Sequence, residues 1–155
     1  MKNRWERSWR VTLDFKKGCR SLRCDDWEFI VKLDGDLSFS PDYFQRGFEH
    51  FRDRPRLGIG GGEIYHEVEG KLILEANPKS HARGATKNYR RPCWEEIGGL
   101  WQGPGRDMLY EVTTNMLGWE TAAFEDLHLI HPRVTGLAEG LVSGTRLYTA
   151  RVVPG

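Results

Sequence analysis

The chain has 155 residues, 39% hydrophobic and 29% charged, a composition typical of one ordinary globular domain. Its formal net charge of +1 gives no electrostatic reason to expect nucleic-acid binding. No apolar run approaches the roughly 20 residues that a membrane span requires, and no signal-peptide core follows Met1. We therefore expect a cytoplasmic protein. Its three cysteines cannot all pair with one another and lack C-x-x-C spacing, which favours reduced thiols.

The first 23 residues are strongly basic, with eight basic and two acidic side chains and hence a net charge of +6. Trp5, Trp9 and Leu13 recur every four residues, so on a helix they share one face. A basic helix with a tryptophan face suits an anionic membrane surface, which would place the protein at the inner face of the membrane. Alternatively, the aromatic face packs on the domain. We treat residues 1–24 as a basic segment that precedes a domain spanning residues 25–150.

The first half of that domain is predicted to contain strands around one helix. Trp27 to Asp34 is β-branched and aromatic, as in a buried strand. Ser40 and Pro41 form a helix start, and phenylalanines at helical spacing extend that helix to residue 53. The segment RPRLGIGGGEIYHEV predicts a second strand, interrupted by three glycines, and KLILEA predicts a short third one.

The second half predicts two helices and two short strands. A helix begins at Pro92 and stops at Gly98 and Gly99. Apolar residues mark one face of a further helix, from about Asp107 to Leu117, which Gly118 closes; they are Met108, Leu109, Val112 and Met116. ETAAF and LHLIHPRV are strand candidates. The mixture predicts an α/β sheet domain.

Two carboxylates follow the first predicted strand, in the sequence Asp34-Gly35-Asp36. In open α/β sheets ligands bind beyond the carboxyl ends of strands, and oxygen ligands suit a hard divalent cation. A calcium loop that starts at Asp34 is excluded, because Phe39 and Gln45 stand where its glycine and its bidentate glutamate belong. The other interpretation is a polar turn that ends a strand.

Other candidates are weaker when each is taken alone. Asp107 begins a helix, where aspartate is also a common cap. The glycines of the second strand indicate either a bulge or the close approach of a ligand. His128 and His131 lie three residues apart in a predicted strand, so they would point to opposite faces and not share a metal.

Order and spacing join these pieces into a known pattern. The series comprises FIVKLDGDLSFSPDYF, RLGIGGGEIY, HARGATKNYRRPCWEEIGGL, GRDMLYEVTTNMLGWET and HPRVTG. It resembles the family-2 glycosyltransferases, which are inverting, nucleotide-sugar-dependent enzymes with a GT-A fold. The resemblance covers roughly Asp25 to Tyr148. It implies a Rossmann-like mixed sheet flanked by helices.

The resemblance also implies roles for particular residues. Asp34 and Asp36 match the D-x-D motif that binds the donor, with Asp36 on a Mg²⁺ or Mn²⁺ ion that also holds the diphosphate. Asp107 matches the general base, although Arg106 stands where the family often has Glu or Trp. His131 matches a histidine that completes the metal site. Further matches are Gly61 and Gly62 on the donor side, and Gly84, Arg91 and Arg133 on the acceptor side.

The expected activity is metal-dependent transfer of a hexose from a UDP- or GDP-sugar. The acceptor would be a saccharide or a lipid-linked molecule, in polysaccharide or glycolipid synthesis. A complete family member has a strand, a helix and another strand before D-x-D, whereas only 33 residues precede Asp34 here. The chain therefore resembles the C-terminal two-thirds of a catalytic domain. An apolar sheet edge that favours self-association is one expected consequence; a non-catalytic binding remnant is the alternative function.

Overall fold

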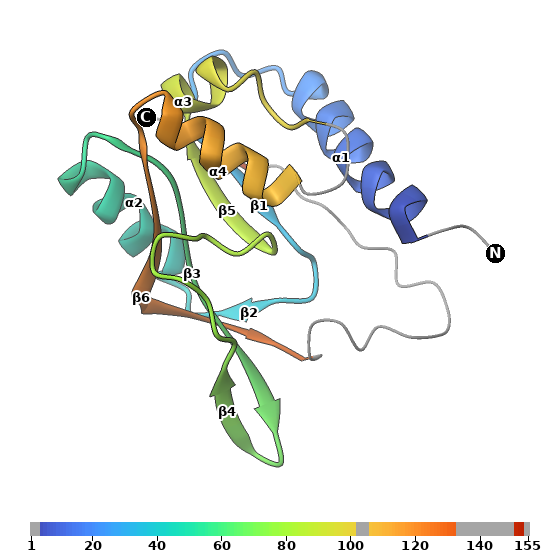
Figure 1. Cartoon of the computed structure of the whole chain (residues 1–155), viewed down its shortest axis with the longest axis vertical. Helices are drawn as coiled ribbons and strands as arrows, with labels where there is room; N and C mark the ends of the chain where they lie inside the picture. Colours follow the sequence, from blue (N-terminus) through green and yellow to red (C-terminus); the bar gives the residue numbers. More distant parts are fainter. Residues whose placement is uncertain (1–3, 102–105, 133–150, 154–155) are drawn as a thin grey trace.

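The computed structural model describes residues 4–101, 106–132 and 151–153, with side chains for residues 13–101 and 108–132. Its central feature is one seven-stranded sheet with helices against it (Figure 1). The elements in chain order are α1 (Arg4–Ser21), β1 (Phe29–Leu33), β2 (Ser38–Phe39), α2 (Tyr43–Asp53), β3 (Leu57–Val68), β4 (Lys71–Leu74), β5 (Thr86–Arg90), α3 (Arg91–Glu96), α4 (Arg106–Met116), β6 (Glu120–His131) and β7 (Arg151–Val153).

The sheet is mixed. Its strand order is β2-β6-β3-β5-β1-β7, and β4 pairs with β3 away from this path. Strands β3 and β6 are parallel, whereas the other pairs are antiparallel. The long β3 and β6 curl at their far ends, where β3 and β4 project as a hairpin (Figure 1). The predicted α/β class is therefore confirmed as a curled mixed sheet flanked by helices.

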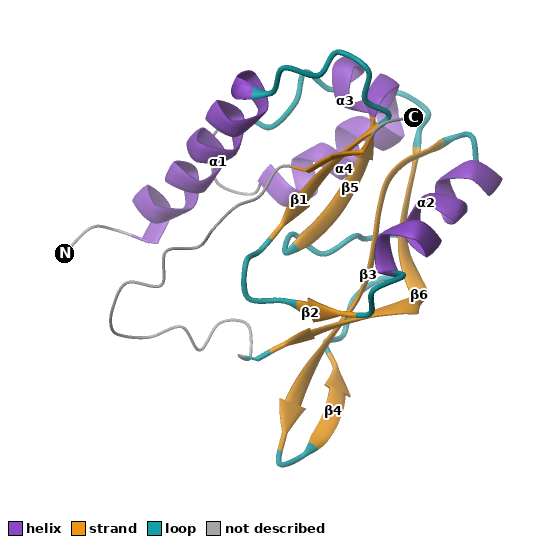
Figure 2. Cartoon of the chain, turned by 180° about the vertical axis from the view of Figure 1, so that it is seen from behind, coloured by secondary structure: helices purple, strands orange, loops and turns teal. Residues whose placement is uncertain are grey.

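Two apolar clusters fill the two sides of the sheet. Phe15 from α1 and Tyr110 from α4 share one cluster with buried residues of β1, β3, β5 and α3. On the other side, Tyr43 and Phe51 of α2 pack with buried residues of β1, β3 and β6. Figure 2 shows α2 in front of the sheet and α3 and α4 behind it. Alternation along β1 explains the division, because Phe29 joins the α2 side and the next residue, Ile30, joins the other.

The basic N-terminal segment forms a helix, as predicted. In α1 the Phe15 side chain is only 2% exposed and meets the Trp94 ring edge-on, with 6.1 Å between ring centroids. The second half of this helix therefore packs on the domain. The side chains of Trp5 and Trp9 lie outside the described part of the structure. Among the described residues, no helix is both long and apolar enough to cross a membrane.

Strand β7 stands at one end of the strand order, next to β1. It pairs antiparallel with β1, with Val152 opposite Ile30. Strand β1 is therefore paired on both sides over residues 29–31, by β5 and by β7. The expectation of an exposed apolar edge named no strand, and self-association through a sheet edge stays a prediction.

Two predicted strands are one, and three strands, β2, β5 and β7, were not predicted. ETAAF and LHLIHPRV belong to the single β6, which is bent by a register shift opposite Gly62 and Glu63. Strand β5 has the polar sequence TKNYR, yet its first four residues are buried. It was missed because polar residues in a fully buried strand give no apolar pattern.

Candidate functional site

The Asp34-Gly35-Asp36 turn lies where it was predicted, directly after β1. The backbone N–H of Asp34 donates to the Ala85 carbonyl at 2.8 Å, which fixes the turn to the loop before β5. The chain then enters β2, which pairs with β6 so that Ser38 faces Ile130. This pairing carries Asp36 to the end of β6, where His131 is the last residue.

Asp36 and His131 meet across that junction. His131 Nε2 lies 3.5 Å from Asp36 Oδ1, and the histidine side chain is 11% exposed. Asp36 Oδ1 is buried and has no hydrogen-bond partner among the described residues. A buried carboxylate oxygen without a donor is costly, so this oxygen is poised to accept a proton donor or a cation. The fold thus brings together the two residues predicted from the sequence as metal ligands.

The pair fits a shared divalent cation in part. Two ligand atoms 3.5 Å apart can both lie about 2.1 Å from one ion, and carboxylate with imidazole is an ordinary donor set for a transition metal. Within the described residues, no group of three or more His, Cys, Asp or Glu side chains is arranged to hold a metal. The other ligands would therefore be phosphate oxygens and water, as is usual for Mg²⁺ with phosphate substrates.

Asp34 faces a buried ammonium group. Lys32 lies two residues earlier on β1, so both side chains project from the same face of the sheet. Lys32 Nζ is 3.6 Å from Asp34 Oδ1 and also donates to the Gly84 carbonyl. The structure therefore gives Gly84, a predicted acceptor-side residue, a contact with the D-x-D strand. Sequence reasoning did not single out Lys32; the signal that could have found it is a lysine within an otherwise apolar strand.

A second buried lysine lies directly across from the first. Lys87 of β5 pairs with Lys32 in the β1–β5 register and is fully buried. Its Nζ donates to Glu111 Oε1 of α4 at 2.9 Å. Glu111 also contacts His81 Nδ1 and accepts the backbone N–H of Ala82 at 3.1 Å. One carboxylate on α4 thus balances the buried charge of β5 and holds the loop that precedes it.

Asp107 occupies the first turn of α4, and its side chain lies outside the described part of the structure. Glu111 follows it by one helical turn, so both residues lie on the same side of the helix. Because Glu111 is anchored to Lys87, α4 is attached to β5, the strand that pairs with β1 and so lies next to Asp34. Sequence reasoning missed Glu111, whose position was not part of the apolar face.

A second histidine adjoins the Asp36–His131 pair. His66 of β3 lies beside His131 in the parallel β3–β6 register, with 5.6 Å between ring centroids. Its Nε2 is 3.1 Å from Glu75 Oε2, and Glu75 also pairs with Arg83. His66 is thus held by a carboxylate and is turned edge-on to the candidate ligand. No local pattern identifies His66 as a site residue, because pairing between the distant strands β3 and β6 is not predictable from sequence.

The two predicted donor-side glycines have a packing explanation. A Cβ on Gly61 would collide with the Thr86 carbonyl, and one on Gly62 with the Leu127 carbonyl. The Gly62 N–H donates to the Tyr43 hydroxyl at 2.9 Å, beside the register shift in β3. Of the two interpretations left open, a bulge with close backbone approach accounts for both glycines without a ligand.

Arg91 does not reach this end of the sheet. Its backbone N–H donates to the Glu28 carbonyl, six residues before Asp34, which is roughly 20 Å along an extended chain. Its guanidinium contacts Glu95 and the Asp25 carbonyl and stacks on the Trp27 ring at 4.9 Å. In the structure Arg91 ties the segment before β1 to α3, away from the Asp34–Asp36 turn, and its acceptor-side role stays a prediction. Arg133 lies outside the described residues.

No protein-family model matches the chain, and no curated protein matches it.

Proposed function

We propose that this chain carries the metal site of a glycosyltransferase, which transfers a sugar from a nucleoside diphosphate to a saccharide or lipid-linked hydroxyl. The observation that carries the proposal is the meeting of Asp36 with His131 beyond the end of β1. These residues are far apart in the sequence, and the family resemblance assigns both to the metal. The curled mixed sheet flanked by helices is compatible with a GT-A-like fold.

Sugar transfer requires both a metal ion at the leaving diphosphate and a general base at the acceptor hydroxyl. A Mg²⁺ or Mn²⁺ ion held at the site would neutralise the charge that develops on the leaving diphosphate. Asp36 and His131 would bind that ion, while Asp34 is held in place by Lys32. Asp107 would accept the proton of the attacking hydroxyl, which requires a carboxylate within about 3 Å of the acceptor oxygen.

The anchoring of α4 supports this division of roles. The Lys87–Glu111 contact fixes the helix that carries Asp107 to the strand next to β1. A base must be held at a fixed distance from the reacting centre, because small displacements cost large factors in rate. A buried ion pair one turn from Asp107 restricts such movement.

The test is calorimetric titration of the full chain with UDP and GDP, each with and without Mn²⁺. We expect binding of at least one nucleotide to depend on Mn²⁺, and Asp36→Asn and His131→Ala to abolish that dependence. The matched control is Asp126→Asn, because Asp126 also pairs with a histidine, His50, at 2.8 Å but on the α2 side. This control should bind as wild type does.

The outcomes separate the candidate functions. Loss of binding in Asp36→Asn but not in Asp126→Asn supports the metal site. Turnover of a bound UDP- or GDP-sugar that is lost in Asp107→Asn supports transfer, whereas binding with no turnover favours the non-catalytic remnant. If neither nucleotide binds with Mn²⁺, or if Asp36→Asn binds as well as wild type, the proposal is wrong.

A further inference from the structure

Exposed apolar side chains are concentrated in two places on the described part of the molecule. The hairpin patch, on the β3–β4 hairpin, consists of Val68, Leu72, Ile73 and Leu74. The α4 patch, on α4 and the residues beside it, consists of Trp101, Met108, Leu109, Val112, Met116 and Leu117. Single exposed apolar residues need no explanation, but contiguous patches mark interaction sites. The α4 patch is the larger set.

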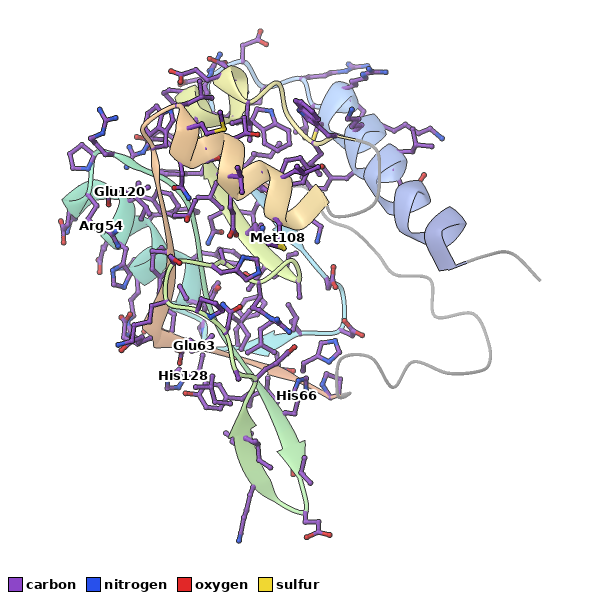
Figure 3. The ribbon with its side chains drawn as sticks, in the orientation of Figure 1. Arg54, Glu63, His66, Met108, Glu120 and His128 are labelled. Carbon is purple, nitrogen blue, oxygen red and sulfur yellow. The ribbon has the colours of Figure 1, made fainter. Side chains whose placement is uncertain are left out.

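In an ordinary amphipathic surface helix the apolar face packs on the core, whereas in α4 the apolar face is exposed and polar residues face the sheet. Its apolar residues Met108 and Met116 are 68% and 83% exposed. Its sheet-facing residues include Glu111 and Thr114, which are 7% and 0% exposed. The apolar positions follow one side of the helix over two turns, so they form a continuous stripe. Figure 3 shows Met108 at the start of α4, on the side of the molecule where α1 lies.

The buried charges explain why the helix keeps this orientation. Turning the apolar stripe inward would move Glu111 away from the buried ammonium of Lys87, 2.9 Å from its carboxylate. It would also expose Tyr110, whose hydroxyl donates to the Trp101 carbonyl at 2.7 Å. The exposed stripe is therefore fixed by contacts on the inner face of the helix.

Helix α1 adds positive charge to the apolar α4 patch, and the two together resemble a lipid-binding surface. Helix α1 lies on the same side of the sheet as α4, since Phe15 and Tyr110 share one cluster. The first 23 residues carry eight basic and two acidic side chains, and Lys17 and Arg20 are exposed. Trp101, whose carbonyl accepts the Tyr110 hydroxyl of α4, is 53% exposed, and tryptophan favours the membrane interface. An apolar stripe beside a basic helix matches an anionic lipid surface.

We propose that the α4 patch and α1 together form a face that binds anionic membranes. A second copy of the chain is a poorer occupant, because a two-fold contact through α4 would bring two basic helices toward each other. The proposal does not depend on sugar transfer. If transfer is also correct, the helix that carries Asp107 would lie at the bilayer surface, where lipid-linked acceptors are found.

The test is co-sedimentation of the full chain with vesicles of equal parts phosphatidylglycerol and phosphatidylcholine, compared with pure phosphatidylcholine. We expect binding to the anionic vesicles only, weakened by salt. The α4 variant Met108→Gln/Val112→Gln/Met116→Gln should lower the partition coefficient about tenfold or more, because three apolar side chains no longer leave water. Glutamine preserves helix propensity, so the fold should persist.

The matched control is the hairpin variant Leu72→Gln/Ile73→Gln/Leu74→Gln, which removes as many exposed apolar side chains from the other patch. It should bind within about twofold of wild type. A charge variant, Lys17→Glu/Arg20→Glu, should weaken binding to anionic vesicles and leaves α4 untouched.

Four results would overturn the proposal: no binding by wild type, equal loss in the α4 and hairpin variants, wild-type binding by the α4 variant, or no effect of the charge variant. A dimer in gel filtration that only the α4 variant dissociates, with vesicle binding unchanged, would assign the patch to self-association.

Discussion

The buried Lys87–Glu111 pair gives the sharpest prediction about the fold. Lys87 Nζ lies 2.9 Å from Glu111 Oε1, with side chains 0% and 9% exposed. Glu111→Leu removes the carboxylate that faces a fully buried ammonium, and breaking such a pair costs about 3–5 kcal/mol. A domain of this size is stable by roughly 5–15 kcal/mol, so the variant should be severely destabilised but should still fold at the upper end of that range.

Replacing the lysine of the pair should reduce the free energy of unfolding by less than replacing the glutamate does. Lys87→Met leaves Glu111 in contact with His81 and the Ala82 N–H, so the carboxylate keeps partners and the loss should be about 1.5–3 kcal/mol. The double variant Lys87→Met/Glu111→Leu should be more stable than the sum of the two single changes predicts, by about 1–3 kcal/mol. Replacing both members of a buried pair by apolar residues is often nearly neutral.

The assay is urea unfolding at neutral pH, followed by far-ultraviolet circular dichroism and tryptophan fluorescence. The control is Glu120→Gln, because Glu120 pairs with Arg54 at 2.7 Å with side chains 50% and 44% exposed, at the opposite end of the sheet from His66 (Figure 3). That exposed pair should contribute less than about 1 kcal/mol. If the two single losses add within about 0.5 kcal/mol in the double variant, the pair is not coupled and the anchoring of α4 is wrong.

Three further predictions concern other parts of the fold. Gly61→Ala should destabilise the protein strongly because its Cβ meets a backbone carbonyl, whereas Gly18→Ala, in an open part of a helix, should stabilise it by up to about 1 kcal/mol; urea unfolding of both variants checks this. Burial raises the pKa of the Cys93 thiol to about 11, so Ellman's reagent at neutral pH should label Cys93 only on unfolding; labelling at the rate of an exposed thiol would contradict its burial. Burial raises the pKa of Asp126, but the hydrogen bond and charge of His50, with a neighbouring arginine, outweigh burial and hold that pKa below its usual range. The folded pKa is the lower one, so this stabilisation is present above the unfolded pKa near 4 and is lost as pH falls through the folded value. The stability difference between wild type and Asp126→Asn should therefore shrink in acid, and a constant difference would refute the assignment.

The part of the site that sequence could predict depends on local pattern. A β-branched run that ends in Asp34 and Asp36 specifies a strand and a turn over a few neighbouring residues, and the structure confirms both. The meeting of Asp36 and His131 depended instead on strand pairing, and only the family resemblance placed them together. Pairing between distant strands leaves no local signal.

The orientation of α4 and the buried Lys87–Glu111 pair could not be predicted from the sequence, because polar groups here occupy the interior. The apolar stripe with Met108 and Met116 is a pattern that ordinarily faces a core, yet it lies outward. The helix presents its polar face to the sheet because the buried ammonium of Lys87 on β5 pairs with the Glu111 carboxylate. A buried ion pair across two elements outweighs the local amphipathic pattern, and neither partner can be recognised before the other is placed.

The most direct test of the metal site is an experimental structure of crystals soaked with Mn²⁺ and UDP or GDP, with anomalous scattering measured from manganese. We predict an anomalous manganese peak within coordination distance of both Asp36 Oδ1 and His131 Nε2. No manganese peak between these residues, or peaks only at other carboxylates, would contradict it.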